Sequence, residues 1–418
     1  MNSFTSKMKE NLLGNPSYPC VYYKGVLGTK PSLILFYQNQ ELHVQHPTES
    51  FTMNLPPLAA VEFLEELLTN LPKQEFTQLM GYFSFEFGLK LQNNKLNKTK
   101  LATQKIRDFY FILPTEYQFF DAEFNPIKTV TLPITERVFE TPNQTFAEIK
   151  QNPAEFSSNL SKKEYNQALE KIRKLIIDGE TYQVNFAQKW SGTSNKTPLQ
   201  IFEELFKINP SSHQAILYTA NFSIISNSPE CLFVKEKNSL KTYPIKGTLP
   251  SSKDPKELLE SKKDQAELEM IVDLERNDLG QIAKAGTVKV TKHRYLETYS
   301  NVHHTLSEIS CKVDSKIKFS QIFKSLFPGG SITGCPKFRT SQFIHDLEPD
   351  LREYYCGSLG FINQNGNSEF NILIRTILNI GQNCYFHSGG GITIQSIDGL
   401  EYEETIHKAS NLIKVLSS

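Results

Sequence analysis

Alternating apolar and polar residues predict strands in the first part of the chain. Residues 32–46 (SLILFYQNQELHVQH) and residues 80–91 (MGYFSFEFGLKL) alternate with a period of two, which is typical of strands. Between them, residues 55–71 (LPPLAAVEFLEELLTNL) place apolar side chains three and four positions apart, which predicts a helix. Residues 91–100 (LQNNKLNKTK) are polar and basic, so we expect an exposed loop there.

A turn-rich stretch over residues 140–159 (ETPNQTFAEIKQNPAEFSSN) divides the chain into two parts. A strong helical pattern follows it and begins near Ser161. We therefore predict a strand-rich N-terminal subdomain over residues 1–150 and a second domain over residues 151–418. The sequence shows no internal repeat, so a solenoid is not expected.

The charge balance limits the classes of partner. The chain has 45 basic and 45 acidic residues, so no global field draws it to nucleic acid or to an anionic membrane. Its first residues lack the apolar stretch of a signal peptide, and no window approaches the ~20 apolar residues that span a bilayer, so we expect a cytoplasmic protein. The six cysteines include no C-x-x-C pair, so their spacing predicts neither a zinc site nor a disulfide framework.

Two residues near predicted strand ends are candidates for catalysis. Lys246, in TYPIKGTLP, would ordinarily face solvent, but a lysine desolvated in a pocket loses its proton readily and can act as a nucleophile. Glu230 follows a turn proline in SIISNSPECLF, where most glutamates lie at the surface. Beside a buried amine, however, Glu230 could be a general acid that protonates a departing hydroxyl group.

Acidic residues share the apolar face of a helix predicted between Pro255 and Gly286. Glu267 and Ile271 are four positions apart, and Asp264 and Asp278 extend the same stripe. An unpaired carboxylate in a core is costly, so these groups need an arginine, another cation or a metal ion as partner. For Asp278, a local structural network is the alternative.

A glycine-rich segment, residues 326–348 (LFPGGSITGCPKFRTSQFIHDLE), runs into a predicted helix. Its spacing is similar to a phosphate-binding loop, but Gly334 is followed by Cys-Pro-Lys, so a nucleotide site is unsupported. The simpler interpretation is a tight connection whose backbone amides, with the hydroxyls of Ser331 and Thr333, shape an anion pocket.

The C-terminal part combines glycines with cationic residues. Glu404 and Lys408 are four apart on a predicted helix, a spacing typical of a weak exposed ion pair. Just upstream, residues 389–391 are all glycine and let backbone amides approach a ligand closely, while Arg375 on a neighbouring predicted strand could pair with a carboxylate. Together these residues indicate a site for a dianionic small molecule.

Many short motifs occur in an order that resembles the chorismate-binding enzyme family over residues 161–418. They are GETYQVN, SPE, PIKGT, AELEMIVDLERNDLG, HHTLS, FPGGSITGCPK, GGGITIQS and EYEETIHKAS. In the first half, GYFSFEFG resembles the N-terminal region of the aminating members. The resemblance implies an α/β (α+β) fold like that of anthranilate synthase component I, in which large antiparallel sheets enclose the active site and helices flank them.

The resemblance also implies site residues. Glu267 and Glu404 match the family's Mg²⁺ ligands, and Asp264 matches a further acidic residue near the metal. The residues that match the chorismate-binding positions are His304, Thr333, Tyr355, Arg375, Gly390, Gly391 and Lys408. Among these, His304 and Thr333 would line the substrate ring, and Tyr355 and Arg375 form a predicted strand pair.

Two positions distinguish the subfamilies. Lys246 resembles the 4-amino-4-deoxychorismate synthases of 4-aminobenzoate and folate biosynthesis, whereas anthranilate synthases usually carry alanine there. Gln183 stands where the isochorismate and salicylate synthases carry a lysine. The implied reaction is attack by Lys246 at ring carbon 2 while Glu230 protonates the departing 4-hydroxyl, followed by addition of ammonia at carbon 4.

The source of ammonia implies a partner. The chain shows no glutamine amidotransferase nucleophile motif, so we expect a separate glutaminase subunit to supply ammonia. Two alternatives stay open at this point: an anthranilate synthase component I with an unusual lysine, and a catalytically silent chorismate-binding protein. Product analysis with chorismate, Mg²⁺ and ammonia distinguishes them.

Overall fold

The fold is described from a computed structural model. It covers residues 19–74, 76–93, 100, 106–121, 123–133, 138–139, 155–208, 210–298 and 302–417. Most of the loop predicted at residues 91–100 and most of the linker predicted at residues 140–159 lie outside these described ranges.

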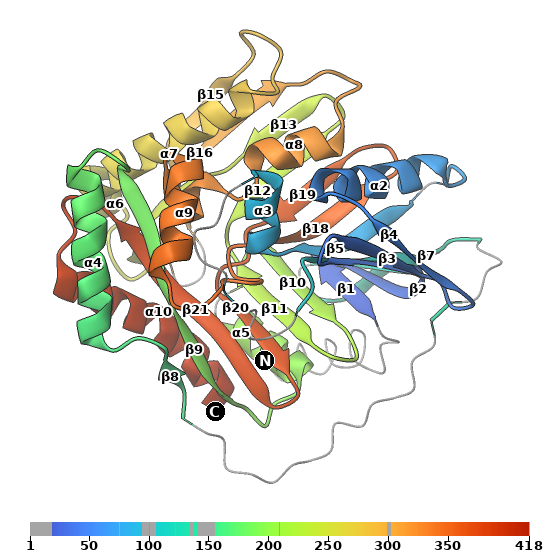
Figure 1. Ribbon diagram of the computed structural model, residues 1–418, viewed down its shortest axis with the longest axis horizontal. Coiled ribbons are helices and arrows are strands. Elements are labelled where there is room, and N and C mark those ends of the chain that lie inside the picture. Colours follow the sequence, from blue (N-terminus) through green and yellow to red (C-terminus); the bar gives the residue numbers. More distant parts are fainter. Residues whose placement is uncertain are drawn as a thin grey trace.

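The sheet is antiparallel at every pairing between the described strands, and it branches at the long pair β2 (Val26–Gln38) and β6 (Phe109–Phe120). β3 (Glu41–Gln45), β4 (Ser50–Asn54) and β7 (Pro126–Thr131) extend this pair at its edges. Two arms leave it, as Figure 1 shows. The branching lets one continuous sheet form two walls.

The first arm continues from β6 through strands that are mostly from the second half of the chain. In order these are β5 (Gln78–Phe83), β18 (Ser358–Asn363), β19 (Ser368–Asn371), β12 (Cys231–Glu236), β13 (Ser239–Thr242) and β16 (Val302–Lys312). Strands β14 (Ile245–Pro250) and β15 (Lys289–Thr298) also pair with β16.

The second arm continues from β2. Its strands are β1 (Cys20–Tyr23), β10 (His213–Tyr218), β11 (Ser223–Ser228), β20 (Thr376–Ile380), β21 (Asn383–Ile392) and β9 (Gln183–Thr193). The short strands β8 (Ser157–Ser158) and β17 (Gly334–Cys335) pair with β9. Hydrogen bonds between β1 and β10 and between β5 and β18 therefore join the two parts of the chain, and the division at residue 150 stays a prediction.

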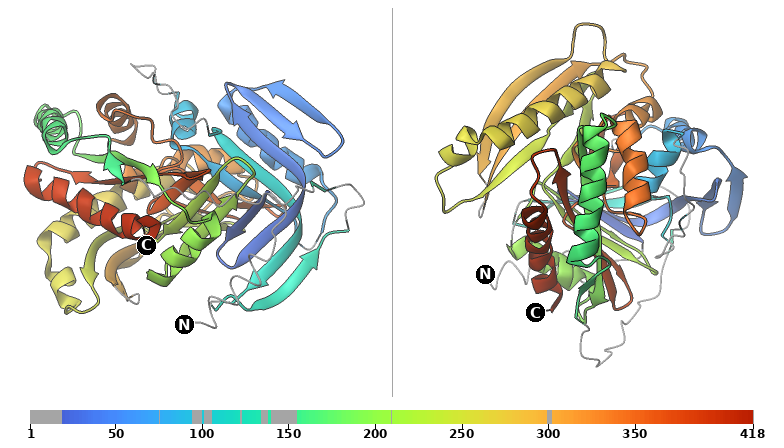
Figure 2. Two further views of the ribbon diagram at one scale, coloured as in Figure 1. Left: turned by 90° about the horizontal axis from the view of Figure 1, so that it is seen from below. Right: turned by 60° about the vertical axis from the view of Figure 1, so that its left-hand side comes forward.

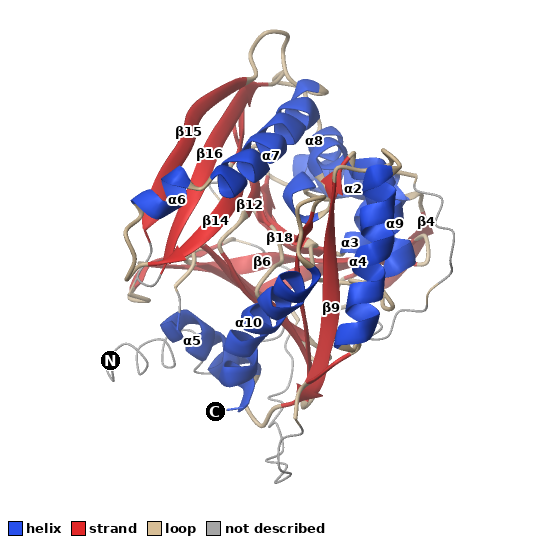
Figure 3. Ribbon diagram, turned by 90° about the vertical axis from the view of Figure 1, so that its left-hand side faces the viewer, coloured by secondary structure: helices blue, strands red, loops and turns tan. Residues whose placement is uncertain are grey.

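Helices cover the arms. α7 (Lys262–Gly280) packs on β14 and β16, and α10 (Asp398–Ser417) packs on β21 and contacts α4 (Lys162–Ile177) and α5 (Pro198–Ile208). Figure 3 shows α7 and α10 on the same side of the molecule. In Figure 2, α4, α9 (Lys337–Leu347) and α10 lie away from the N-terminal strands, which α2 (Pro57–Asn70) covers together with α8 (Phe319–Leu326). The predicted α/β (α+β) class, with antiparallel sheets flanked by helices, is confirmed.

Aromatic packing holds the two parts of the chain together. The ring of Phe83, at the end of β5, lies 4.2 Å from that of Phe323 in α8 and 5.9 Å from that of Phe370 in β19. All three side chains are fully buried. Burying one phenylalanine side chain contributes about 1.5–3 kcal/mol, so this cluster is a substantial part of the core.

Local signals explain where the helices begin. Ser161 caps α4 by accepting a hydrogen bond from Glu164 N, and the Glu164 side chain accepts one from Ser161 N, which confirms the predicted helix start. The strand predicted over residues 80–91 is wrong after Phe83. Ser84 accepts a hydrogen bond from Phe87 N and starts helix α3 (Phe85–Leu91).

The helix predicted between Pro255 and Gly286 is two helices. A short helix, α6 (Lys256–Glu260), ends at Ser261, whose backbone is extended. The Ser261 hydroxyl accepts a hydrogen bond from Asp264 N and starts α7, which ends at Gly280. The continuous helix was therefore wrong, because serine favours a new N-terminus over helix continuation.

Within the described ranges, no helix combines the length and the apolar character needed to cross a membrane.

Candidate active site

A cavity of about 620 Å³ lies between the two arms of the sheet, beside α7 and α10. The predicted site residues that line it come from both arms and both helices: Glu230, Lys246, Asp264, Glu267, His304, Tyr355, Arg375, Gly390, Gly391, Glu404 and Lys408. Thr333 is the one predicted site residue that does not line it. The fold thus brings together residues that are far apart in the sequence.

Lys246 reaches the cavity from a distorted strand. The pairing of β14 with β16 shifts register between Lys246 and Thr248, and Gly247 between them has φ 75°, which favours glycine. The ammonium of Lys246 lies 3.5 Å from the backbone oxygen of Ser331. The bulge therefore directs this lysine into the site instead of along a regular strand face.

Glu230 lies opposite, in the connection between β11 and β12. Its backbone N–H donates to Ser228 Oγ over 3.1 Å, and its backbone oxygen accepts from Ile372 N over 3.0 Å, so the main chain is fixed on both sides. The carboxyl atom Oε1 is buried and has no hydrogen-bond partner among the described residues.

The surroundings of Glu230 favour its protonated form. Burial raises the pKa of this carboxyl group, and this effect outweighs the Ser331 hydroxyl and the positive charges of Lys246 and Arg375, which lower it. A buried carboxylic acid that keeps its proton is suited to general acid catalysis.

Four carboxylates gather at one end of the cavity. Asp264 and Glu267 come from α7, and Glu401 and Glu404 come from α10. Burial raises the pKa of Glu267; Lys246 and Lys263 oppose this rise, and the negative charges of Asp264 and Glu404 add to it.

The same crowding affects the carboxylates of α10. Burial and the charge of Glu404 raise the pKa of Glu401. Burial also acts to raise the pKa of Glu404, but Lys408, Lys263 and Lys246 lower it overall. A divalent cation would relieve this mutual repulsion, and carboxylate oxygens are the protein ligands that Mg²⁺ prefers, so the donor set fits the predicted ion.

Glu401 was missing from the predicted site. It lies three positions before Glu404, so the two side chains share one face of α10. The motif EYEETIH was therefore enough to predict Glu401 as a site residue, because residues three or four positions apart on a helix share one face.

The glycine run lies against these carboxylates. A Cβ atom at Gly390 would lie 3.6 Å from Glu401 Oε2 and from Glu404 Oε1. Lys408 Nζ lies 2.6 Å from Glu404 Oε1 and donates to the backbone oxygen of Gly389 over 2.9 Å. The predicted ion pair is present, and it also ties α10 to β21.

Cationic and aromatic groups form another wall. Arg375 has φ 49°, an uncommon backbone conformation for arginine, and its backbone oxygen accepts from Asn227 N. No described residue hydrogen-bonds to its guanidinium group, which therefore stays available to an anion. The ring of Tyr355 stacks on His387 at 4.8 Å.

His304 presents a neutral ring. Burial lowers the pKa of His304 to about 4, and its Nδ1 lies 3.2 Å from the backbone oxygen of Gly247. A neutral imidazole beside Lys246 avoids a second positive charge next to the amine.

The sequence matches the family of chorismate binding enzymes over residues 18–414. The chain belongs to this family. It is 32% identical over 400 residues to aminodeoxychorismate synthase component 1 of Bacillus subtilis, a match that covers 89% of this chain and 85% of the relative. It is 37% identical over 270 residues to the Escherichia coli protein of the same name, covering 63% and 60% of the two chains.

A solved structure supports the fold. The anthranilate synthase component I of Streptococcus pneumoniae superposes with a TM-score of 0.79 at 24% sequence identity, covering 96% of this chain and 93% of that chain. The likeness in fold thus extends over both arms of the sheet.

Thr333 lies close to the cavity in sequence but does not line it. It is fully buried, and its hydroxyl donates to the backbone oxygen of Gly329 over 2.9 Å. Ser331 lies within a single turn of 3-10 helix, η1 (Gly330–Ile332), and Thr333 directly follows this turn. Of the two hydroxyl residues, only Ser331 lines the cavity. The contact of Thr333 with the substrate ring stays a prediction.

Tyr355 and Arg375 also differ from the sequence prediction. Tyr355 lies in the turn before β18, and Arg375 lies just before β20, so the two residues are not a strand pair. Both nevertheless line the cavity, because connections at strand ends can direct side chains inward.

Asp278 belongs to a structural network. Its carboxylate accepts a hydrogen bond of 2.7 Å from Lys337 Nζ, which also donates to the backbone oxygen of Ser325 over 2.8 Å. The acidic stripe of α7 therefore divides: Asp264 and Glu267 face the cavity, and Asp278 fastens α9 to α7.

Proposed function

We propose that this chain is the component 1 subunit of an aminodeoxychorismate synthase that acts in the cytoplasm. It would replace the 4-hydroxyl group of chorismate by an amino group and form 4-amino-4-deoxychorismate. The observation that carries this proposal is that Lys246 and Glu230 line the same cavity as a carboxylate cluster and Arg375. Relatives of this name support it.

The first step uses both catalytic residues. The Lys246 amine forms a bond to ring carbon 2, the ring double bonds shift, and the bond from carbon 4 to oxygen breaks. Glu230 gives its proton to the departing hydroxyl group, which leaves as water. The raised pKa of Glu230 suits this role, because the proton is present when the bond breaks.

The second step restores the enzyme. Ammonia forms a bond to carbon 4, and the bond between carbon 2 and Lys246 breaks, so that its electron pair returns to the lysine as a free amine. The ammonium group formed at carbon 4 can return a proton to the Glu230 carboxylate. Covalent catalysis thus replaces one difficult displacement by two easier ones.

Binding of the dianionic substrate rests on cationic groups. Arg375 and Lys408 both line the cavity, and the glycines at residues 389–391 leave room for a ligand beside the backbone. Asp264, Glu267, Glu401 and Glu404 would hold Mg²⁺, which when bound supplies positive charge for a substrate carboxylate.

Ammonia would come from a separate glutamine amidotransferase subunit. The component numbering in the names of the relatives supports a second subunit. Because ammonia itself is the nucleophile, the isolated chain should aminate chorismate when ammonium salts are supplied.

The decisive experiment compares wild type with Lys246→Ala in chorismate, Mg²⁺ and ammonia, with product identified by mass spectrometry. We expect the wild type to form 4-amino-4-deoxychorismate and Lys246→Ala to lose this activity, while Mg²⁺-dependent chorismate binding persists. Lys284→Ala, an exposed lysine of the same chain, is the matched control. Undiminished turnover by Lys246→Ala would refute the covalent route.

Anthranilate synthase component I is the second candidate, which the fold likeness to the Streptococcus pneumoniae protein favours. Formation of anthranilate by the wild type would establish it in place of 4-amination. Binding of chorismate without any product would instead indicate a silent chorismate-binding protein.

A further inference from the structure

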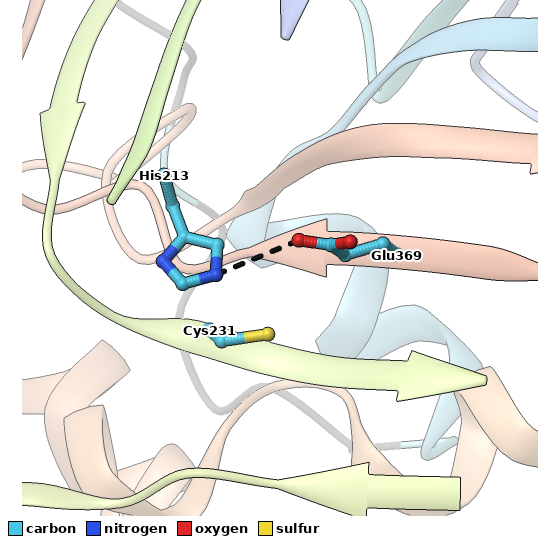
Figure 4. Close-up of side chains that lie close together, drawn as sticks. All are labelled: His213, Cys231 and Glu369. Carbon is cyan, nitrogen blue, oxygen red and sulfur yellow. Dashed lines mark ion pairs between the residues drawn. The ribbon is translucent and has the colours of Figure 1, made fainter. Parts of the chain in front are cut away.

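A second group of potential metal ligands lies behind the strand connection that carries Glu230. Glu230 lines the cavity, whereas the next residue, Cys231, does not. One ring nitrogen of His213, the sulfur of Cys231 and a carboxylate oxygen of Glu369 all lie within 4.8 Å of one another. Figure 4 shows the three side chains converging from β10, β12 and β19.

We propose that His213, Cys231 and Glu369 bind a divalent d-block cation of the Zn²⁺ type. This site goes beyond the proposed function and does not depend on it. Nitrogen, thiolate sulfur and carboxylate oxygen together form a ligand set that such ions favour, whereas Mg²⁺ favours oxygen ligands.

The distances suit this ion. Bonds of about 2.0–2.3 Å from Zn²⁺ to its ligands place ligand atoms of a tetrahedral site about 3.3–3.8 Å apart. His213 Nε2 and Glu369 Oε1 are already 3.6 Å apart. Only the thiol of Cys231 has to move closer, by about 1 Å on the same geometry.

The hydrogen bonds of His213 turn a ring nitrogen toward Glu369. Nδ1 lies 2.9 Å from Ser212 Oγ, which itself donates to the backbone oxygen of Pro229 over 3.3 Å. With Nδ1 as the donor to Ser212 Oγ, Nε2 presents its lone pair to a metal ion. This second-layer support is typical of a histidine that binds a metal ion.

The carboxylate of Glu369 already holds two hydrogen-bond donors. Its Oε1 accepts from Lys24 Nζ over 2.6 Å and from Tyr23 Oη over 3.3 Å. His213 Nε2 lies 3.6 Å from the same oxygen. A bound metal ion would coordinate both atoms, in place of the Lys24 and Tyr23 donors.

Lys24 is the competing cation. Its ammonium lies 2.6 Å from Glu369 Oε1, and its side chain is 41% exposed. An exposed lysine contributes little to such a pair and can move into solvent when a metal ion binds. Lys24 therefore sets the affinity of the site without being one of its ligands.

The site has a consequence for the cavity. Cys231 is bonded in sequence to Glu230, whose backbone is held by Ser228 and Ile372. A cation at Cys231 would join β10, β12 and β19 directly behind the proposed general acid. It would therefore hold Glu230 in place without contacting the substrate.

The test uses the whole chain, freed of metal by a chelator, then saturated with Mg²⁺ and titrated with Co²⁺. Cobalt bound to a thiolate gives a charge-transfer absorption that cobalt on carboxylates does not, so binding at the Mg²⁺ carboxylates is not counted. We expect one Co²⁺ per chain with this absorption, displaced by Zn²⁺. Cys231→Ser should abolish it, and Cys335→Ser, which changes a half-buried cysteine elsewhere, should leave it unchanged.

Two further variants separate a metal site from a structural network. His213→Gln should weaken Co²⁺ binding at least about tenfold. Lys24→Met should strengthen it about two- to fivefold, because the competing ammonium is gone; this exposed position also keeps the test valid if His213→Gln does not fold. Absence of the thiolate absorption in the wild type, its survival in Cys231→Ser, or unchanged affinity in Lys24→Met would overturn the proposal.

Discussion

The guanidinium group of Arg352 is held by the carboxylate of Glu348 through two hydrogen bonds, of 2.6 Å and 2.9 Å. Their side chains are only 2% and 5% exposed. Arg352 also donates to the backbone oxygens of Ile332 and Asn185, so one side chain joins η1 and β9 beside the cavity.

We expect Arg352→Leu to lower the free energy of unfolding by about 3–5 kcal/mol, because it leaves the buried Glu348 carboxylate without its positively charged partner. Urea unfolding followed by circular dichroism measures this. The matched control is Arg276→Leu, which removes an exposed ion pair with Asp273 and should change stability by about 0.5 kcal/mol or less. Equal effects of the two variants would contradict the structural role of Arg352.

We expect Glu230→Gln to lower the turnover of chorismate by about 10²–10⁴-fold, because glutamine cannot donate the proton. In the wild type, turnover should fall as pH rises through the pKa of Glu230, which burial raises, since only the protonated acid is active. This limb of the pH profile should be absent in the variant. Glu236→Gln, at the exposed end of β12, is the control, and a wild-type rate that rises over the same pH range would exclude Glu230 as the acid.

The buried carboxyl group of Glu86 should make the stability of the fold depend on pH. Burial and the charge of Glu353 raise the pKa of Glu86 from 4.5 to about 8, and its Oε2 has no hydrogen-bond partner in the described part of the chain. The folded state therefore holds this proton more tightly than the unfolded state does. Its contribution to stability is complete below pH 4.5 and is lost as pH rises toward 8.

Glu86→Gln should remove this dependence, because glutamine stays neutral and can still accept the hydrogen bond from Arg352 N. Relative to wild type, the variant should become more stable with rising pH, by at most about 1.4 kcal/mol per pH unit in this window. Unfolding free energies at pH 5, 6.5 and 8 measure the difference. A difference that is constant with pH would show that Glu86 does not titrate there.

Magnesium dependence tests the carboxylate cluster. Removing Mg²⁺ with a chelator should abolish turnover, and Glu404→Gln should raise the Mg²⁺ concentration needed for half-maximal rate at least about tenfold. Glu403→Gln is the matched control, since this neighbouring residue pairs with Lys162 on the outside of α10. If both variants need the same Mg²⁺ concentration, Glu404 is not a ligand.

Local patterns predicted much of the fold but not its exceptions. The capping sequence at Ser161 fixed the start of α4, because the cap and the helix are neighbours in sequence. Residues 85–91 alternate like a strand, yet they form α3, because neighbouring elements bury this short helix on several sides. Periodicity cannot distinguish a strand from a helix when nearly every position is buried.

The site shows a similar division. Acidic spacing on one helix predicted that Asp264 and Glu267 face the same way, but it could not show that Lys337 neutralises Asp278. Cysteine spacing could not indicate the proposed site of His213, Cys231 and Glu369. These residues are far apart in the sequence and approach one another only through strand pairing. Partners that come from distant strands carry no periodic signal in the sequence.

The pairing of β9 with β21 has a consequence for synthesis of the protein. The two strands pair from Thr193 opposite Asn383 to Val184 opposite Ile392, so β9 leaves the ribosome long before its neighbour exists. Pairing over such a separation is slow, and the waiting edge of β9 can aggregate. We therefore expect the unpaired edge of β9 in a nascent chain to need protection from aggregation until β21 and α10 have been translated. The cavity can form only after that point, because residues of α10 line it.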